Sequence, residues 1–136
     1  MTPADALLAV TALHAGFQAV VTVVVYPALR DLTVDAWPAG HTAHSRRISV
    51  LVVPVYLLVL VACGWVLYDG AATSWGGAVA IAGNALALAT TAFAAAPTHA
   101  RLGRLGPDPA LVARLLLADR VRLLAVLVAL AGALAG

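Results

Sequence analysis

Four apolar runs alternate with short polar stretches along the chain. Three of the runs approach the length of about 20 residues that lets a helix cross a bilayer, at about 6–26, 48–68 and 76–96. The fourth run, 121–135, is shorter, and we extend it back to about residue 115 so that it reaches a spanning length. The pattern predicts four transmembrane helices.

Local signals predict where two helical segments begin. Pro109 follows Asp108, and this is the order expected of an N-cap and a first helical position, so one long helix should begin there. Residues 36–47 predict an interfacial helical segment that leads straight into the second span. Asp35 is available as the cap of that segment.

Proline and glycine positions give further expectations about the spans. Pro54 should kink or locally open the second span, with ordinary packing of a membrane helix as the alternative. The segment 97–103, which begins with Pro97, is expected to close the third span. Gly132 and Gly136 have the GxxxG spacing, but they lie at the chain end and we give the motif little weight.

Composition agrees with a bilayer and excludes a soluble globule. Of the 136 residues, 63% are hydrophobic and 10% are charged, whereas soluble domains are about 45–50% apolar and about 25% charged. We therefore expect residues 1–136 to form a single transmembrane domain in contact with membrane lipid. Cys63 is the one cysteine, so an internal disulfide and multi-thiolate metal sites are excluded.

The basic residues orient the spans. Eight arginines lie in two groups, one between the first two spans and one between the third span and the apolar part of the fourth: Arg30, Arg46 and Arg47, then Arg101, Arg104, Arg114, Arg120 and Arg122. By the positive-inside rule both groups face the cytoplasm, and the turn at 69–75 faces outward. We expect an all-α, up-down four-helix bundle in the inner (plasma) membrane with both termini on the outer side. The arginines form no patch with interleaved aromatics, so nucleic acid is not an expected partner.

Polar residues inside the spans form a predicted inner layer. The first span carries five at intervals of three and four: Thr11, His14, Gln18, Thr22 and Tyr26. They share one face, which should turn toward the bundle interior. At about 1.5 Å per residue, His14 and Asn84 lie at one depth and Tyr56 lies near the depth of Gln18. These four residues line a binding pocket, or they form a hydrogen-bond network that only holds the bundle together.

Titratable groups gather at the expected cytoplasmic end. His41 and His44 are one turn apart on one helix face, and His99 lies just beyond the third span. With Asp119 and Tyr26 they can converge, since the two loops lie on one side. Interfacial anchoring by snorkelling side chains is the alternative explanation.

Asp119 is the hardest of these groups to explain as an anchor, because its short side chain needs a partner. The candidates are Arg122, Arg46 and His99. A divalent metal would use His41, His44, His99 and Asp119. Bis-histidine haem would need a second histidine at the depth of His14, which a partner subunit in a homo-oligomer could supply.

In four short segments the chain resembles the anthrone-oxygenase-like superfamily of four-helix membrane proteins: Val25-Tyr26-Pro27-Ala28-Leu29, Pro54-Val55-Tyr56, Pro97-Thr98-His99-Ala100-Arg101-Leu102 and Asp119-Arg120-Val121-Arg122. Many family members have Asn at the position of His99, and the pair His41 and His44 is not general among them. The resemblance implies oxidation of a phenol or anthrone by O₂ without a bound cofactor.

That chemistry needs a base, donors for the oxygen of the resulting anion, and an apolar pocket. For this chemistry we hypothesise His99 as base, oriented by Asp119, with Arg122 and Tyr26 stabilising the oxygen and His44 as alternative base. His14, Gln18, Tyr56 and Asn84 would orient the far end of a small apolar aromatic substrate. The competing hypotheses are a non-catalytic membrane subunit or assembly factor and a histidine-based metal- or haem-binding membrane protein.

Overall fold

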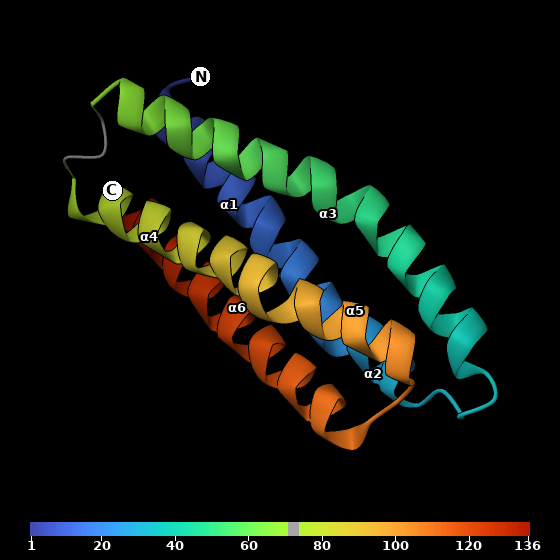
Figure 1. Cartoon of the computed structure of the whole chain (residues 1–136). Coiled ribbons are helices and arrows are strands. Elements are labelled where there is room, and N and C mark those ends of the chain that lie inside the picture. The colour runs from blue at the N-terminus through green and yellow to red at the C-terminus, as the bar shows by residue number, and fades with distance from the viewer. Residues whose placement is uncertain (71–73) are drawn as a thin grey trace.

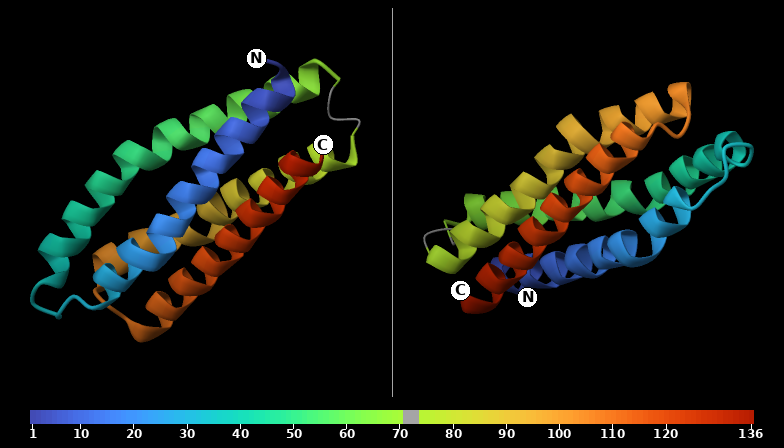
Figure 2. Two further views of the ribbon diagram at one scale, coloured as in Figure 1. Left: turned by 180° about the vertical axis from the view of Figure 1, so that it is seen from behind. Right: turned by 90° about the horizontal axis from the view of Figure 1, so that it is seen from below.

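Four helical rods run side by side and alternate in direction (Figure 1). The computed structural model describes residues 1–70 and 74–136, and no strand occurs among them. Both termini lie at the same end of the rods, as the views in Figure 2 also show. Residues 71–73 of the turn that we expect to face outward lie outside the described part of the chain.

Helices and two single π-helical turns make up the rods. In chain order they are α1 (Pro3–Val20), η1 (Val21–Val25), α2 (Tyr26–Arg30), α3 (Trp37–Tyr68), α4 (Trp75–Thr90), η3 (Thr91–Ala95), α5 (Ala96–Leu105) and α6 (Pro109–Ala135). The first rod is α1 to α2, the second is α3, the third is α4 to α5 and the fourth is α6. The first three rods are long and apolar enough to cross a membrane.

The outer surface of the rods is apolar, and the buried interior holds polar side chains. Phe93 is 81% exposed and Val23 is 72% exposed, while Thr11, His14 and Asn84 are fully buried. A water-soluble protein has the opposite arrangement. The apolar exterior is consistent with contact with membrane lipid.

One predicted cap is confirmed and one is wrong. Asp108 caps α6, since its carboxylate accepts a 2.9 Å hydrogen bond from the backbone N–H of Leu111. Asp35 does not cap α3, because the N-cap is Ala36, whose side chain makes no capping hydrogen bond. The predicted interfacial segment 36–47 is the first part of α3, which continues through Pro54 and bends along its length (Figure 2).

The segment 97–103, which we expected to close the third span, continues the helix of the third rod. Helix continues from Pro97 to Leu105, and Pro27 likewise lies inside the first rod. Each proline follows a π turn, in which the N–H of Tyr26 bonds to the carbonyl of Val21 and the N–H of Ala96 bonds to the carbonyl of Thr91. A proline ring clashes with the carbonyl four residues earlier in a regular helix. The wider turn relieves that clash and lets the helix pass through.

Small residues hold α4 and α6 in the most extensive helix contact of the bundle. A Cβ added to Gly83 would lie 2.5 Å from the carbonyl oxygen of Ala125, and one added to Gly132 would lie 2.8 Å from the carbonyl oxygen of Gly76. Gly136 also faces α4 closely. The GxxxG pair, to which we gave little weight, is therefore part of this contact.

The substitution Gly83→Ala tests how tight this contact is. We expect it to lower the free energy of unfolding by about 1–3 kcal/mol, because the new methyl group has no room. Gly16→Ala is the matched control, since no atom lies within 4 Å of its added Cβ. Reversible unfolding in detergent micelles, followed by loss of helical signal, measures both. Equal stability of the two variants would show that the helices are not in close contact.

Candidate functional site

A buried ion pair lies between the rods. Arg122 and Asp119, three residues apart on α6, are 5% and 2% exposed, and the Nη2 atom of Arg122 lies 3.1 Å from Oδ1 of Asp119. Gln18 donates to the same oxygen at 2.7 Å. Arg122 also donates to the Tyr26 hydroxyl at 2.9 Å and to Oγ1 of Thr91 at 3.4 Å. The first, third and fourth rods thus share one charge-assisted network.

The position of Asp119 differs from the expected one. We placed this carboxylate at the cytoplasmic end and considered Arg122, Arg46 and His99 as partners. It pairs with Arg122, and its contact with Gln18 puts it near the middle of the first rod. His99 bonds elsewhere, so a direct orienting role of Asp119 on His99 finds no contact to support it.

A second buried group lies closer to the end that carries the termini. The Nδ1 atom of His14 lies 2.9 Å from Oδ1 of Asn84, as their equal depth predicts. Because the Asn84 amide nitrogen donates to Oγ1 of Thr11 at 2.9 Å, Oδ1 is the acceptor and His14 carries its proton on Nδ1. The ring of Tyr56 meets His14 edge-on at 5.3 Å. The Tyr56 hydroxyl lies 2.6 Å from Oγ1 of Thr91, which joins this group to Arg122.

Three histidines and a tyrosine converge at the opposite end. The Tyr26 hydroxyl lies 3.4 Å from Nε2 of His99, and Nδ1 of His99 lies 3.4 Å from Nε2 of His41. The ring of His44 stacks on His99 at 5.4 Å with an interplanar angle of 22°. Nε2 of His44 is buried without a hydrogen-bond partner. α2, α3 and α5 therefore bring together the residues whose convergence the loop positions predict.

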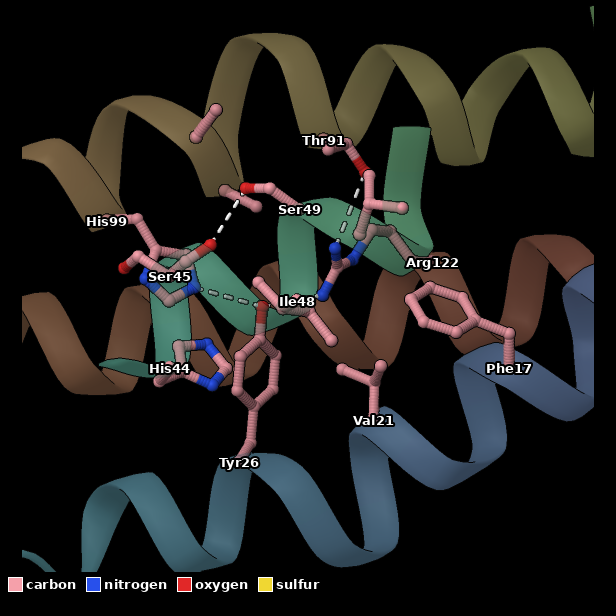
Figure 3. Close-up of a pocket in the computed structure, with 13 residues that line it drawn as sticks. Phe17, Val21, Tyr26, His44, Ser45, Ile48, Ser49, Thr91, His99 and Arg122 are labelled. Atoms are coloured by element: carbon pink, nitrogen blue, oxygen red, sulfur yellow. Dashed lines mark hydrogen bonds between the residues drawn. The ribbon is translucent and has the colours of Figure 1, made fainter. Parts of the chain in front are cut away.

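A cavity of about 210 Å³ opens beside this cluster (Figure 3). Most of its wall is apolar, and its polar groups come from every rod. Its lining is Phe17, Val21, Tyr26, His44, Ser45, Ile48, Ser49, Val52, Thr91, Ala95, Ala96, His99 and Arg122. Figure 3 shows Tyr26, His44 and His99 gathered on one side and Thr91 with Arg122 on another.

The other predicted binding residues lie apart from this cavity. None of them belongs to the described lining. His14 and Asn84 bond to each other, Gln18 bonds to Asp119 of the ion pair, and Tyr56 bonds to the lining residue Thr91.

Thr91 is a lining residue that the sequence reasoning missed. It lies seven residues after Asn84, a spacing that keeps two residues on one helix face, and this signal could have found it.

A wider groove adjoins the cavity. It measures about 460 Å³, lies between the first rod and α3, and shares His44 and Ile48 with the cavity. Arg47 borders it and is exposed. The groove is lined mainly by apolar side chains, and His44 joins it to the cluster.

The four residues expected to hold a metal are divided between two places. His41, His44 and His99 lie together, whereas Asp119 bonds to Gln18 and Arg122. Within residues 1–70 and 74–136, no three His, Cys, Asp or Glu side chains form a group that could hold a metal ion.

Comparisons with protein-family models, with curated proteins and with solved structures find no match to this chain. The functional argument therefore depends on the site itself.

Removing the carboxylate of Asp119 tests the energetic role of the ion pair. Asp119→Ala should lower the free energy of unfolding by about 3–5 kcal/mol, because it leaves the buried Arg122 without its counter-charge. Unfolding in detergent micelles measures the loss. The exposed pair Arg30 and Asp31 is the matched control, and Asp31→Ala should have little measurable effect.

The double variant Asp119→Leu with Arg122→Met separates the pair's own contribution from the cost of an unpaired charge. We expect it to be more stable than Asp119→Ala, since neither charge remains buried. A double variant as unstable as the single one would show that packing at these positions, rather than charge, accounts for the loss.

Proposed function

We propose that this protein is a cofactor-independent oxygenase of the membrane that acts on a small electron-rich aromatic molecule, a phenol or an anthrone. The observation that carries the proposal is the cavity of about 210 Å³ whose apolar wall adjoins Tyr26, His99 and Arg122. Such a cavity accepts a flat apolar ring and places a hydrogen-bond donor and a base beside its polar edge. The resemblance of four short segments to the anthrone-oxygenase-like superfamily points to the same chemistry.

Tyr26 and Arg122 are the groups that stabilise the substrate oxygen in this proposal. Arg122 holds the Tyr26 oxygen at 2.9 Å, so the hydroxyl proton of Tyr26 is available to a substrate carbonyl or phenolate. The positive guanidinium next to the Tyr26 oxygen makes the hydroxyl a stronger hydrogen-bond donor. The low dielectric of an apolar site increases this effect. Asp119 acts indirectly, because it fixes the guanidinium of Arg122.

His99 is the proposed base. Its Nε2 atom faces the Tyr26 hydroxyl across 3.4 Å, a long hydrogen bond that a substrate can replace. A neutral imidazole has one ring nitrogen with a free lone pair, and this suits removal of an acidic C–H or O–H proton. His44 is the alternative base, because its Nε2 atom is buried without a partner and its ring lines the cavity.

The reaction balances without a reductant. A CH₂ group and O₂ give a carbonyl group and water, so one oxygen atom enters the product and the other leaves as water. The substrate supplies all four electrons that reduce O₂. The protein's task is to generate the electron-rich anion in an apolar cavity that admits O₂ and excludes water.

Replacing the proposed base tests the function. His99→Ala should lower kcat for an anthrone or phenol by about a hundredfold or more. The exposed change Arg101→Ala on the same helix is the control and should retain the parent rate. Oxygen uptake and quinone absorbance of the protein in liposomes measure turnover. A large loss in His44→Ala instead would assign the base to His44.

Two results would contradict the proposed function. One is full turnover in both His99→Ala and His44→Ala. The other is a Soret band in the optical spectrum of the purified protein, which would assign the histidines to haem rather than to a cofactor-free reaction.

In the proposed topology the chain crosses the plasma membrane four times with both termini outside. The fourth helix has 27 residues, about 40 Å of rise, and Arg122 points into the bundle rather than into lipid. Arg30 and Arg104 lie in the last residues of α2 and α5, at the end of the rods opposite to the termini (Figure 1). The positive-inside rule makes that end cytoplasmic.

Cysteine labelling tests this topology. In a Cys63→Ala background, Ala135→Cys should react with a membrane-impermeant maleimide on intact cells, because the residue is exposed at the end that carries the termini. Arg104→Cys should react only after the membrane is opened. The reverse pattern would show the opposite orientation, and labelling of both positions in intact cells would contradict a fixed crossing between them.

A further inference from the structure

Arg122 sets the direction of a chain of hydrogen bonds that leads away from the cavity. A guanidinium has only donors, so the Tyr26 oxygen accepts from it at 2.9 Å. The Tyr26 hydroxyl therefore donates its own hydrogen bond to Nε2 of His99. When this nitrogen is the acceptor, a neutral His99 carries its proton on Nδ1.

His41 is the next member of the chain. Its Nε2 atom lies 3.4 Å from Nδ1 of His99 and accepts a hydrogen bond from the N–H group at that position. A neutral His41 therefore carries its own proton on Nδ1. The hydrogen bonds from Arg122 to His41 therefore all point one way, toward the end of the bundle opposite to the termini.

The ends of two helices hold His41 in place. The ring of Trp37 stacks on it at 5.2 Å, and the indole N–H donates to the carbonyl of Leu102 at 3.2 Å. A Cβ on Gly103 would lie 3.2 Å from Cε1 of His41, so a glycine at this position leaves room for the ring. These contacts fix the His41 ring between the two helix ends.

A substrate in the cavity blocks one of the routes by which a proton can leave His99. His99 is half-buried and lines the cavity, so a bound molecule covers that side of its ring. Its Nδ1 side faces His41, which does not belong to the cavity lining and retains 6% exposure. A proton taken up by His99 can leave on this side without passing back through an occupied apolar space.

We propose that His41 is a relay residue that carries the substrate proton from His99 to water. As the substrate bond to hydrogen breaks, its proton bonds to Nε2 of His99. The Nδ1 proton of His99 passes to Nε2 of His41, and the Nδ1 proton of His41 passes to water. Both rings end neutral with their protons on Nε2, and exchange with water restores the starting tautomers. The origin of the proton rests on the proposed function, whereas the direction of the chain does not.

Histidine tautomers test the relay without any substrate. In ¹⁵N-histidine-labelled protein in lipid nanodiscs, NMR should find both His41 and His99 protonated on Nδ1. Tyr26→Phe removes the donor to His99 and should shift both rings away from that state. His14, held by Asn84 at 2.9 Å, should keep its Nδ1 proton and is the internal control. A proton on Nε2 of either His41 or His99 in the parent protein would overturn the proposal.

Turnover gives the second test. His41→Ala should lower kcat at least about tenfold with KM unchanged, and added imidazole should restore part of the rate. His41→Gln, which preserves much of the packing, should show the same loss. Gly103→Ala presses on the ring and should lower kcat, whereas Gly64→Ala, with no atom within 4 Å of its Cβ, should not.

The outcomes separate the relay from the proposed function. Unchanged kcat in His41→Ala beside lost turnover in His99→Ala would overturn the relay and leave the function standing. If the parent protein oxidises none of the substrates, the proposed function fails, and the tautomer measurement alone then supports or overturns the relay.

Discussion

Arg122 is a permanent cation inside an apolar bundle, and the rest of the polar interior depends on neutralising it. Its guanidinium has five donors and no acceptor, so burial is tolerable only where acceptors surround it. Asp119 supplies the counter-charge, and the oxygens of Tyr26 and Thr91 accept further hydrogen bonds. Each acceptor then fixes a neighbour: Gln18 bonds to Asp119, Tyr56 to Thr91 and His99 to Tyr26. One charge thus orders side chains on all four rods.

The two π turns place these acceptors where Arg122 needs them. In a regular helix a residue eight positions after Gln18 lies about 80° round the axis from it. A π turn has more residues in each turn and so reduces that rotation, which keeps Tyr26 on the inner face. η1 and η3 occupy equivalent places in the first and third rods, each followed two residues later by a proline, and His14 bonds to Asn84 at the matching level. The polar groups of the first and third rods therefore lie at matching levels along the bundle.

The sequence predicted the features that depend on position along a helix. It did not predict those that depend on the direction of a side chain about the helix axis. The four helical segments, the Asp108 cap and the shared depth of His14 and Asn84 follow from periodicity and from the rise per residue. The partner of Asp119 needed a choice between three residues, and the expected contact with His99 is not present. Depth along a rod does not tell which way a side chain points, and a π turn changes that direction without any strong sequence signal. The segment 97–103 was expected to close the third span, whereas a π turn lets the helix pass through Pro97 and continue.

Incomplete satisfaction of the polar interior distinguishes this bundle from one built for stability alone. Four buried side-chain atoms among the described residues have no hydrogen-bond partner: Nε2 of His14, Oε1 of Gln18, Nε2 of His44 and Nε of Arg122. Each such atom costs about 1–3 kcal/mol, so apolar residues would make a more stable bundle. The tight contact of α4 with α6 offsets part of this cost and fixes Arg122 on a rigid helix. Two of the four atoms, Nε2 of His44 and Nε of Arg122, belong to residues that line the cavity. All four atoms lower the stability of the bundle, and under the proposed function the two at the cavity leave a donor or an acceptor free for a substrate.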